Sequence, residues 1–206
     1  MQACFGDDWS YAHPKDSEQW RTAVSRVKNR VLLALARGGD IWIMEAGQSD
    51  FSADVLRALN DSEGDYDFKN RINVVQHSYF NHEFTTDVDL ETVIERANYI
   101  RIPDGNASGN GTPRLVTYSG DHWQALQNLE RPLGACWTEA RKHADRAIDD
   151  SEILEILTFK QFPNPSIAFG GMDFSDTVEA VWVLGITEIE TVDDFFNEFI
   201  GESDTQ

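Results

Sequence analysis

Apolar residues along the first third of the chain recur at helical spacing and then gather in short uninterrupted runs. Residues 21–37 carry apolar side chains at the period of 3.6 residues that is typical of one face of a helix. Gly38 and Gly39 follow directly, and glycine at this place predicts the end of that helix. The positions that share the helical spacing are Val24, Val27, Val31 and Leu35.

Three short runs rich in β-branched and aromatic residues predict buried strands at 41–44, 72–75 and 98–102. Predicted helices separate them, one capped by Ser49 or Asp50 and one over 88–96 capped by Thr86 or Asp87. Parallel strands need long crossover connections that are usually helical. The alternation therefore predicts an α/β fold: an open, mostly parallel, Rossmann-like sheet with helices on both faces.

The rest of the chain shows weaker patterns and no linker, so we expect one domain over 1–206. Residues 1–20 have no clear period and predict an irregular arm. The remaining expectations are one helix or two over 121–143 with a break near 132–134, a helix over 151–160, a loop over 162–175, a helix from 177 capped by Asp176, and a short helix over 187–200.

The net charge of the chain limits the classes of partner that it can bind. Asp and Glu number 36 against 17 Lys and Arg, a formal net charge of −19. Such a surface repels nucleic-acid backbones and anionic membranes, and it suits a salty, halophilic or marine habitat. We expect no signal peptide and no membrane span, because no apolar run approaches about 20 residues. Two cysteines, Cys4 and Cys136, favour free thiols in a reducing, cytoplasmic compartment.

Polar side chains follow each predicted strand, and a further polar stretch precedes the helix predicted from 177. The carboxyl ends of parallel strands lie along one edge of a sheet, where ligands bind in open α/β folds. We therefore expect one functional pocket at this edge. Its candidate residues are Glu45, Gln48, Asp50, His77, Asn81, Asp104, Asn106, Asp173 and Asp176.

Each candidate also has a purely structural interpretation. Glu45 either binds a ligand or anchors the following turn, and His77 is either a general acid or base or a structural histidine. Asn81 and Asn106 bind substrate hydroxyls or serve as turn residues. Asp173 and Asp176 lie three residues apart. They share a hard cation such as Ca²⁺, or Asp176 simply caps the next helix.

Four short motifs resemble those of the nucleoside hydrolase superfamily, most closely uncharacterised nucleoside-hydrolase-like proteins of marine bacteria. The resemblance covers about residues 40–185. The motifs are W-I-M-E-A-G at 42–47, H-S-Y-F-N at 77–81, I-P-D-G-N at 102–106 and D-F-S-D at 173–176.

This resemblance implies hydrolysis of an N-glycosidic bond in a ribosyl or sugar compound, with Ca²⁺ holding the sugar hydroxyls and a water molecule. It implies that Asp176 binds the metal, that Asn81 and Asn106 bind hydroxyls, and that Glu45 and His77 line the pocket. Because it leaves the general base open, we take His77 or Asp173 as the catalytic group, with Asp173 and Asp176 as metal ligands.

The chain departs from the superfamily at its start, where the family's aspartate-rich loop supplies most metal ligands and the catalytic base. Asp7-Asp8 is the only early acidic pair. The chain is then a relative that binds without cleaving, takes the missing element from another chain, or uses different acids. Our first hypothesis is a hydrolase of this type that cleaves a glycosidic bond with a divalent cation. The alternatives are a non-catalytic sugar- or nucleoside-binding module and a structural or assembly protein. The missing strand would expose a sheet edge, which makes a homodimer a reasonable expectation.

Overall fold

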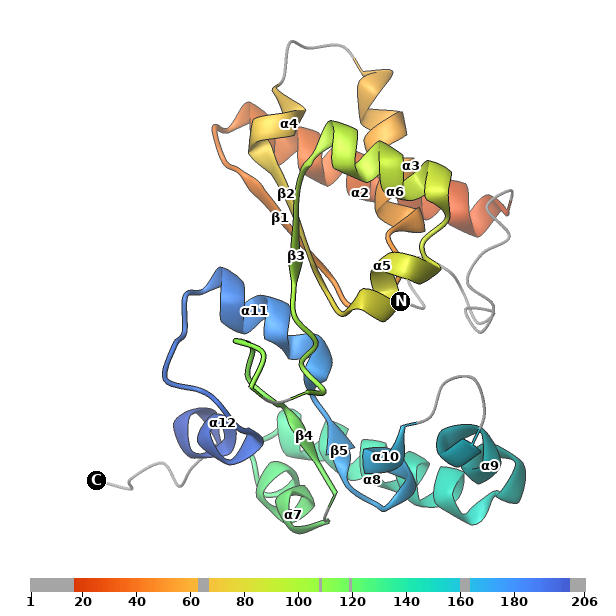
Figure 1. Cartoon of the computed structure of the whole chain (residues 1–206), viewed down its shortest axis with the longest axis vertical. Coiled ribbons are helices and arrows are strands. Elements are labelled where there is room, and N and C mark those ends of the chain that lie inside the picture. Colours follow the sequence, from red (N-terminus) through yellow and green to blue (C-terminus); the bar gives the residue numbers. More distant parts are fainter. Residues whose placement is uncertain (1–16, 63–66, 108, 119, 160–163, 201–206) are drawn as a thin grey trace. The chain divides into compact units, whose positions relative to one another are not determined.

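The computed structural model describes residues 17–62, 67–107, 109–118, 120–159 and 164–200. The chain divides into two compact units, one up to Ile102 and one from Pro103 onward (Figure 1). We describe each unit by itself, and the single domain expected from the sequence stays a prediction. Of the expected irregular arm, residues 1–16 and with them Cys4 and Asp7-Asp8 lie outside the described residues.

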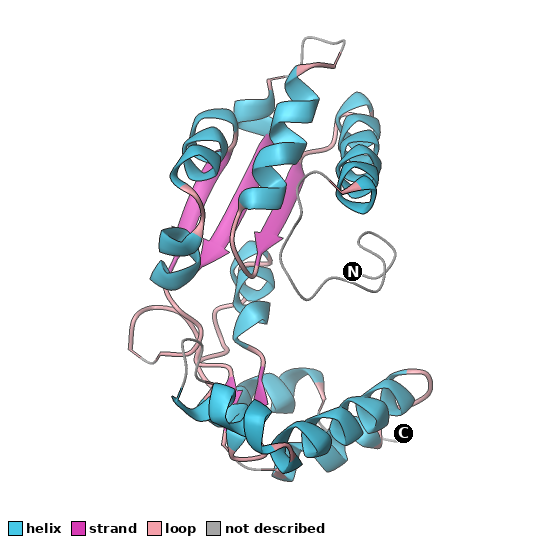
Figure 2. Cartoon of the chain, turned by 90° about the vertical axis from the view of Figure 1, so that its right-hand side faces the viewer, coloured by secondary structure: helices cyan, strands magenta, loops and turns pink. Residues whose placement is uncertain are grey.

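Unit 1 is built on a three-stranded parallel sheet with the strand order β1-β2-β3. Figure 2 shows the three arrows side by side and pointing the same way. The mixed α/β class and the parallel sheet predicted from the sequence are confirmed. The elements in chain order are α2 (Glu18–Ala36), β1 (Ile41–Glu45), α3 (Asp50–Asn60), α4 (Phe68–Arg71), β2 (Ile72–His77), α5 (Tyr79–Phe84), α6 (Asp87–Arg96) and β3 (Asn98–Ile102).

Local chemistry explains the ends of the first helix. Ser17 caps α2 by accepting a hydrogen bond from the backbone N–H of Trp20 at 3.1 Å, so residues 17–20 begin a helix and the arm predicted for them is wrong. Gly38 follows the helix with φ +84°, a left-handed conformation that glycine adopts without steric cost. The predicted glycine stop is confirmed.

Helices α2, α3 and α6 pack on the core face of the sheet, with α3 contacting both of the others. Their apolar stripes meet Ile72 and Val74 of β2 to form one buried core. The helices expected on the second face of this sheet stay a prediction. The edge strands of this sheet are β1 and β3, and a homodimer that pairs one of them also stays a prediction.

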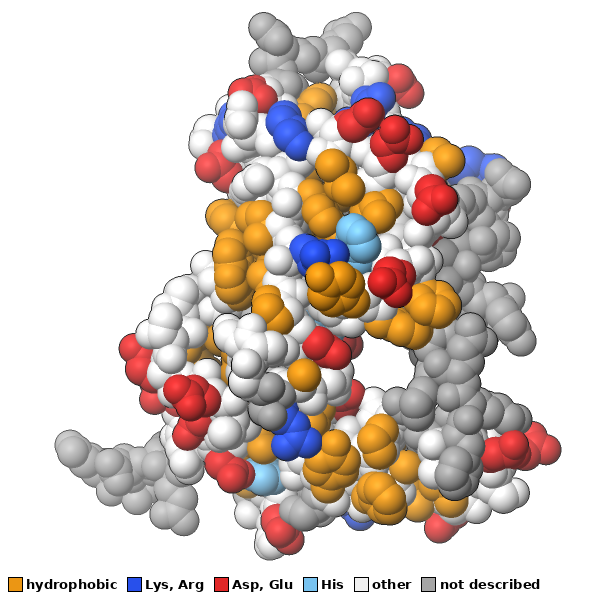
Figure 3. All heavy atoms as spheres, in the orientation of Figure 1, with side chains coloured by type: hydrophobic (Ala, Val, Ile, Leu, Met, Phe, Trp, Pro, Cys, Tyr) orange, Lys and Arg blue, Asp and Glu red, His pale blue; other side chains and the backbone are white. Residues whose placement is uncertain are grey.

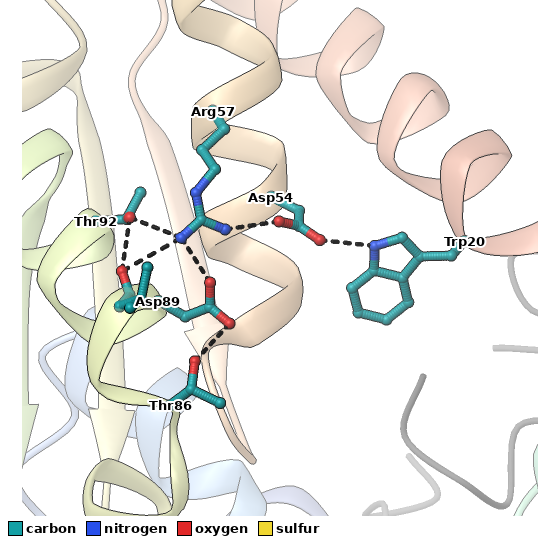
Figure 4. A network of polar contacts seen from close by, with 7 residues as sticks. Trp20, Asp54, Arg57, Thr86, Asp89 and Thr92 are labelled. Carbon is teal, nitrogen blue, oxygen red and sulfur yellow. Dashed lines mark hydrogen bonds and ion pairs between the residues drawn. The ribbon is translucent and has the colours of Figure 1, made fainter. Parts of the chain in front are cut away.

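A polar network ties the three packed helices together (Figure 4). Arg57 of α3 lies 2.7 Å from Asp54 and 2.6 Å from the buried Asp89 of α6. Asp54 in turn accepts a hydrogen bond from the indole N–H of Trp20 in α2 at 2.8 Å. Burial alone would lower the pKa of Arg57, but the two carboxylates raise it overall. Asp89 is thus a compensated buried charge.

Unit 2 is mainly helical around a two-stranded antiparallel sheet. Strands β4 and β5 pair, and residues of α7, α8, α11 and α12 form its core. The elements are β4 (Val116–Thr117), α7 (Asp121–Gln127), α8 (Leu133–Asp149), α9 (Ser151–Phe159), α10 (Pro165–Ala168), β5 (Met172–Asp173), the 3₁₀ turn η1 (Ser175–Thr177), α11 (Val178–Val183) and α12 (Val192–Phe199).

Several predictions for unit 2 are wrong in detail. The loop predicted over 162–175 contains α10 and β5. Asp176 does not cap the following helix, because it lies inside the 3₁₀ turn and Thr177 holds the N-cap position of α11. The last helix begins only at Val192. Over 121–143, by contrast, the structure has two helices, which was one of the two alternatives, and the second begins at Leu133 at the predicted break.

Within the described ranges, no helix combines the length and apolar character needed to cross a bilayer. Acidic side chains lie scattered over the face shown in Figure 3, in both units.

Candidate functional site

The carboxyl end of the parallel sheet carries polar side chains that point toward the helices. In the parallel pairing of the strands, Glu45 of β1 lies opposite Gln76 of β2, and Gln76 lies opposite Arg101 of β3. These three side chains therefore share one face of the sheet. Glu45 accepts a short hydrogen bond from the hydroxyl of Ser52 in α3. The end of β1 is thereby tied to the helix that follows it.

Gln76 is fully buried, and its hydrogen bonds fix which way its amide faces. Its Nε2 donates to the backbone carbonyl of Gly47 at 2.7 Å and to the Ser49 hydroxyl at 2.9 Å. A carbonyl can only accept, so the amide nitrogen must face Gly47 and the amide oxygen must face the other way. That oxygen accepts the hydroxyl proton of Tyr99 at 2.5 Å.

Tyr99 of β3 extends the network to α5. Its hydroxyl oxygen lies 2.8 Å from Nδ1 of His82. Burial is the main cause that raises the pKa of Tyr99 to about 12. The nearby Glu45 carboxylate adds to the rise, and Arg101 opposes it. The phenol therefore stays protonated at neutral pH and keeps donating to Gln76.

A second chain of hydrogen bonds runs along the same edge. The backbone N–H of Ser49 donates to the Thr85 hydroxyl at 3.0 Å, and that hydroxyl donates to the backbone carbonyl of Asn81 at 2.9 Å. The Asn81 side chain donates to the backbone carbonyl of His77 at 3.2 Å. Asn81 thus joins α5 to the end of β2.

The structure separates His77 from this network. His77 follows Gln76 in the same strand, so the two side chains point to opposite faces of the sheet. The buried imidazole of His77 therefore does not face Glu45, and the imidazole of the network belongs to His82. The sequence reasoning missed His82 because it took residues 76–81 for a loop, whereas Tyr79–Phe84 is the helix α5.

Gln48 and Asp50 flank Ser49 in the connection from β1 to α3. Gln48 is half-buried and Asp50 is buried at the first position of α3. The structure thus gathers five of the nine predicted site residues around one sheet end of unit 1: Glu45, Gln48, Asp50, His77 and Asn81.

The other four predicted residues belong to unit 2 and lie on two adjoining segments, the loop that follows β3 and the stretch from the end of β5 into η1. Asp104 accepts hydrogen bonds from the backbone and side-chain nitrogens of Asn106 at 2.9 and 3.2 Å. A Cβ on Gly105 would lie 2.9 Å from the backbone carbonyl oxygen of Ser175, so the two segments touch there. Asp173 is the last residue of β5, and Asp176 follows Ser175 in η1.

Asp173 does not offer a ready cation site. One carboxylate oxygen accepts from the side chain of Asn164 at 2.7 Å and the other from the backbone N–H of Ser175 at 2.9 Å. Asp176 is exposed on the 3₁₀ turn. In the part of the chain that the structure describes, no three His, Cys, Asp or Glu residues gather as metal ligands. The donors seen do not make up a Ca²⁺ site, and Ca²⁺ binding stays a prediction.

The raised pKa of Tyr99 predicts a loss of stability at high pH. Between an unfolded pKa of 10.0 and a folded pKa of about 12, only the unfolded chain gives up this proton, so rising pH favours unfolding. Tyr99→Phe should lessen the drop in the urea midpoint of unit 1 between about pH 9 and about pH 11. Tyr118→Phe in unit 2 is the control, and an equal drop in wild type and Tyr99→Phe would contradict the assignment.

Searches of protein-family models, of curated proteins and of solved structures found no match to this chain.

Proposed function

We propose that the carboxyl edge of the sheet in unit 1 binds a small hydroxyl-bearing molecule, a sugar or a nucleoside. The observation that carries this proposal is the fixed network from Ser49 through Gln76 and Tyr99 to His82, with Glu45 beside Gln76 in the register of the sheet. A carboxylate and an imidazole are held on one face, at the edge where open parallel α/β sheets bind ligands. The Rossmann-like layout expected from the sequence is part of this proposal.

The chemistry of the edge suits a ligand rich in hydroxyl groups. A carboxylate accepts several hydrogen bonds, so Glu45 can accept from a ligand hydroxyl as well as from protein donors such as Ser52. The polar atoms of Gln76 and Tyr99 already form hydrogen bonds within the protein. These two residues therefore orient the site rather than contact the ligand. Glu45, Gln48 and His82 are the residues expected to meet it.

The second candidate function is hydrolysis of an N-glycosidic or other glycosidic bond. One observation favours it: the edge holds both a carboxylate and an imidazole, the two groups most used in general acid–base catalysis. Binding of Ca²⁺ belongs to this candidate as a proposal only.

The test combines binding with turnover. Calorimetry with adenosine and with D-ribose, each with and without added CaCl₂, should show saturable binding to the wild-type chain. Glu45→Gln should weaken that binding about tenfold, because a hydrogen bond to a charged acceptor contributes about 1.5–3 kcal/mol. Glu91→Gln, an exposed position on α6, is the matched control and should bind like wild type.

The same samples decide between the two candidates. Release of free ribose from adenosine would establish the hydrolase, whereas binding without release would establish the binding module. Absence of binding by both compounds, or unchanged binding in Glu45→Gln, would reject the proposal for this edge.

A further inference from the structure

The hydrogen bonds of unit 1 leave His82 one choice of neutral tautomer. Gln76 Nε2 is committed to Gly47 and Ser49, so its Oε1 must accept the hydroxyl proton of Tyr99. Tyr99 has only one hydroxyl proton, and its oxygen can therefore only accept from His82. Nδ1 of His82 must carry the hydrogen across the 2.8 Å contact.

The reverse arrangement would bring two hydrogen-bond acceptors together in the buried interior. If Nδ1 of His82 accepted the proton of Tyr99, the phenol oxygen and Gln76 Oε1 would face each other as two acceptors at 2.5 Å. Turning the amide of Gln76 would only move the clash to the carbonyl of Gly47. Because Gln76 is fully buried, water cannot relieve either conflict.

This tautomer determines the hydrogen-bonding role of Nε2, the other ring nitrogen of His82. A neutral imidazole with hydrogen on Nδ1 has its lone pair on Nε2. The side chain is half-buried, and Nε2 makes no hydrogen bond to any residue in the described ranges. The ring edge thus offers an acceptor at a position set by Tyr99 and Gln76.

We propose that the Gln76–Tyr99 pair locks neutral His82 with its hydrogen on Nδ1, so that Nε2 accepts a hydrogen bond from a hydroxyl of the bound sugar or nucleoside. The tautomer follows from the network alone, whereas the role toward a ligand rests on the proposed function. Gln76 and Tyr99 are positioning residues, and His82 is the residue that meets the ligand. A hydroxyl donor fits this acceptor, whereas a ligand carbonyl would repel it.

The tautomer can be read directly by NMR. Long-range ¹H–¹⁵N correlation spectra of the full chain labelled at histidine nitrogens, taken where the rings are neutral, should show hydrogen on Nδ1 and a bare Nε2 for His82. His82→Gln assigns the signal by its loss. Tyr99→Phe removes the acceptor that holds Nδ1–H, and the ring should shift toward the Nε2–H form that free histidine prefers. Hydrogen on Nε2 in the wild-type chain, or no change in Tyr99→Phe, would overturn the lock.

The role toward the ligand has its own readout. Adenosine or D-ribose should shift the ¹⁵N resonance of Nε2 more than that of Nδ1. His82→Asn keeps an N–H near Tyr99 but removes the Nε2 acceptor, and it should weaken binding about tenfold. His143→Asn, an exposed histidine of unit 2, is the matched control. If a probe binds and Nε2 does not respond, the role is rejected. If neither probe binds, the proposed function fails while the tautomer result stands by itself.

Discussion

Replacing Gly171 by alanine should destabilise unit 2 by at least about 3 kcal/mol, the largest effect we expect of any single methyl group. A Cβ at this position would lie 1.9 Å from the backbone carbonyl oxygen of Thr117 and 2.9 Å from the Cα of Tyr118. Both contacts are to backbone atoms of or beside β4, so no side-chain rotation relieves them. The strands β4 and β5 would have to separate.

Hydrogen exchange followed by mass spectrometry on the full chain measures this effect unit by unit. Peptides from β4 and β5 should lose protection in Gly171→Ala, while peptides from the sheet of unit 1 keep theirs. Gly120→Ala is the matched control in unit 2, since its nearest neighbour is the end of the Arg141 side chain at 3.4 Å and its φ is −82°. Equal protection in the two variants would show that Gly171 does not make the close approach.

Leu59→Ala should destabilise unit 1 by about 3 kcal/mol. Leu59 is fully buried on α3, where it packs into the core formed with Ile72 and Val74 of the central strand. Truncation to alanine removes apolar contacts and leaves a cavity that α3 cannot close without breaking its polar links, from Asp54 to α2 and from Arg57 to α6.

Urea unfolding of the full chain, with protection of unit 1 peptides as the readout, checks this prediction. Leu33→Ala on α2 is the control, because Leu33 is 43% exposed and its truncation removes little buried surface. A loss below about 1 kcal/mol in Leu59→Ala, or equal losses in both variants, would mean that the core tolerates the cavity.

The strands and long helices of unit 1 were predictable because their signals are local. Runs such as 41–44 are apolar over the length of a strand, and the flanking turn residues mark where they stop. The short elements of unit 2 carry no such signal. A two-residue strand has no period to detect, and α10 begins at Pro165 in a stretch whose prolines and glycines favour a loop. These short elements form because of contacts with residues that are distant in the sequence.

For the candidate site, the sequence predicted its place at the carboxyl edge of the sheet but not which side chains meet there. The sequence located the polar strand ends correctly, but ending the second strand at Val75 instead of His77 hid which side chains share a face. A difference of one residue in a strand moves a side chain to the other face of the sheet. Because β2 continues to His77, the imidazole of His77 faces away from Tyr99, and the imidazole beside Tyr99 comes from His82 on α5, a helix that the sequence analysis did not predict.

The division of the chain after Ile102 has a consequence for how the protein is made. All strands and helices of unit 1, and every residue of its hydrogen-bonded edge, leave the ribosome before most of unit 2 has been synthesised. Each strand pairs with the next in order, so the sheet can add strands in the order of translation. The edge that we propose as the binding site therefore lies entirely in the unit that is synthesised first.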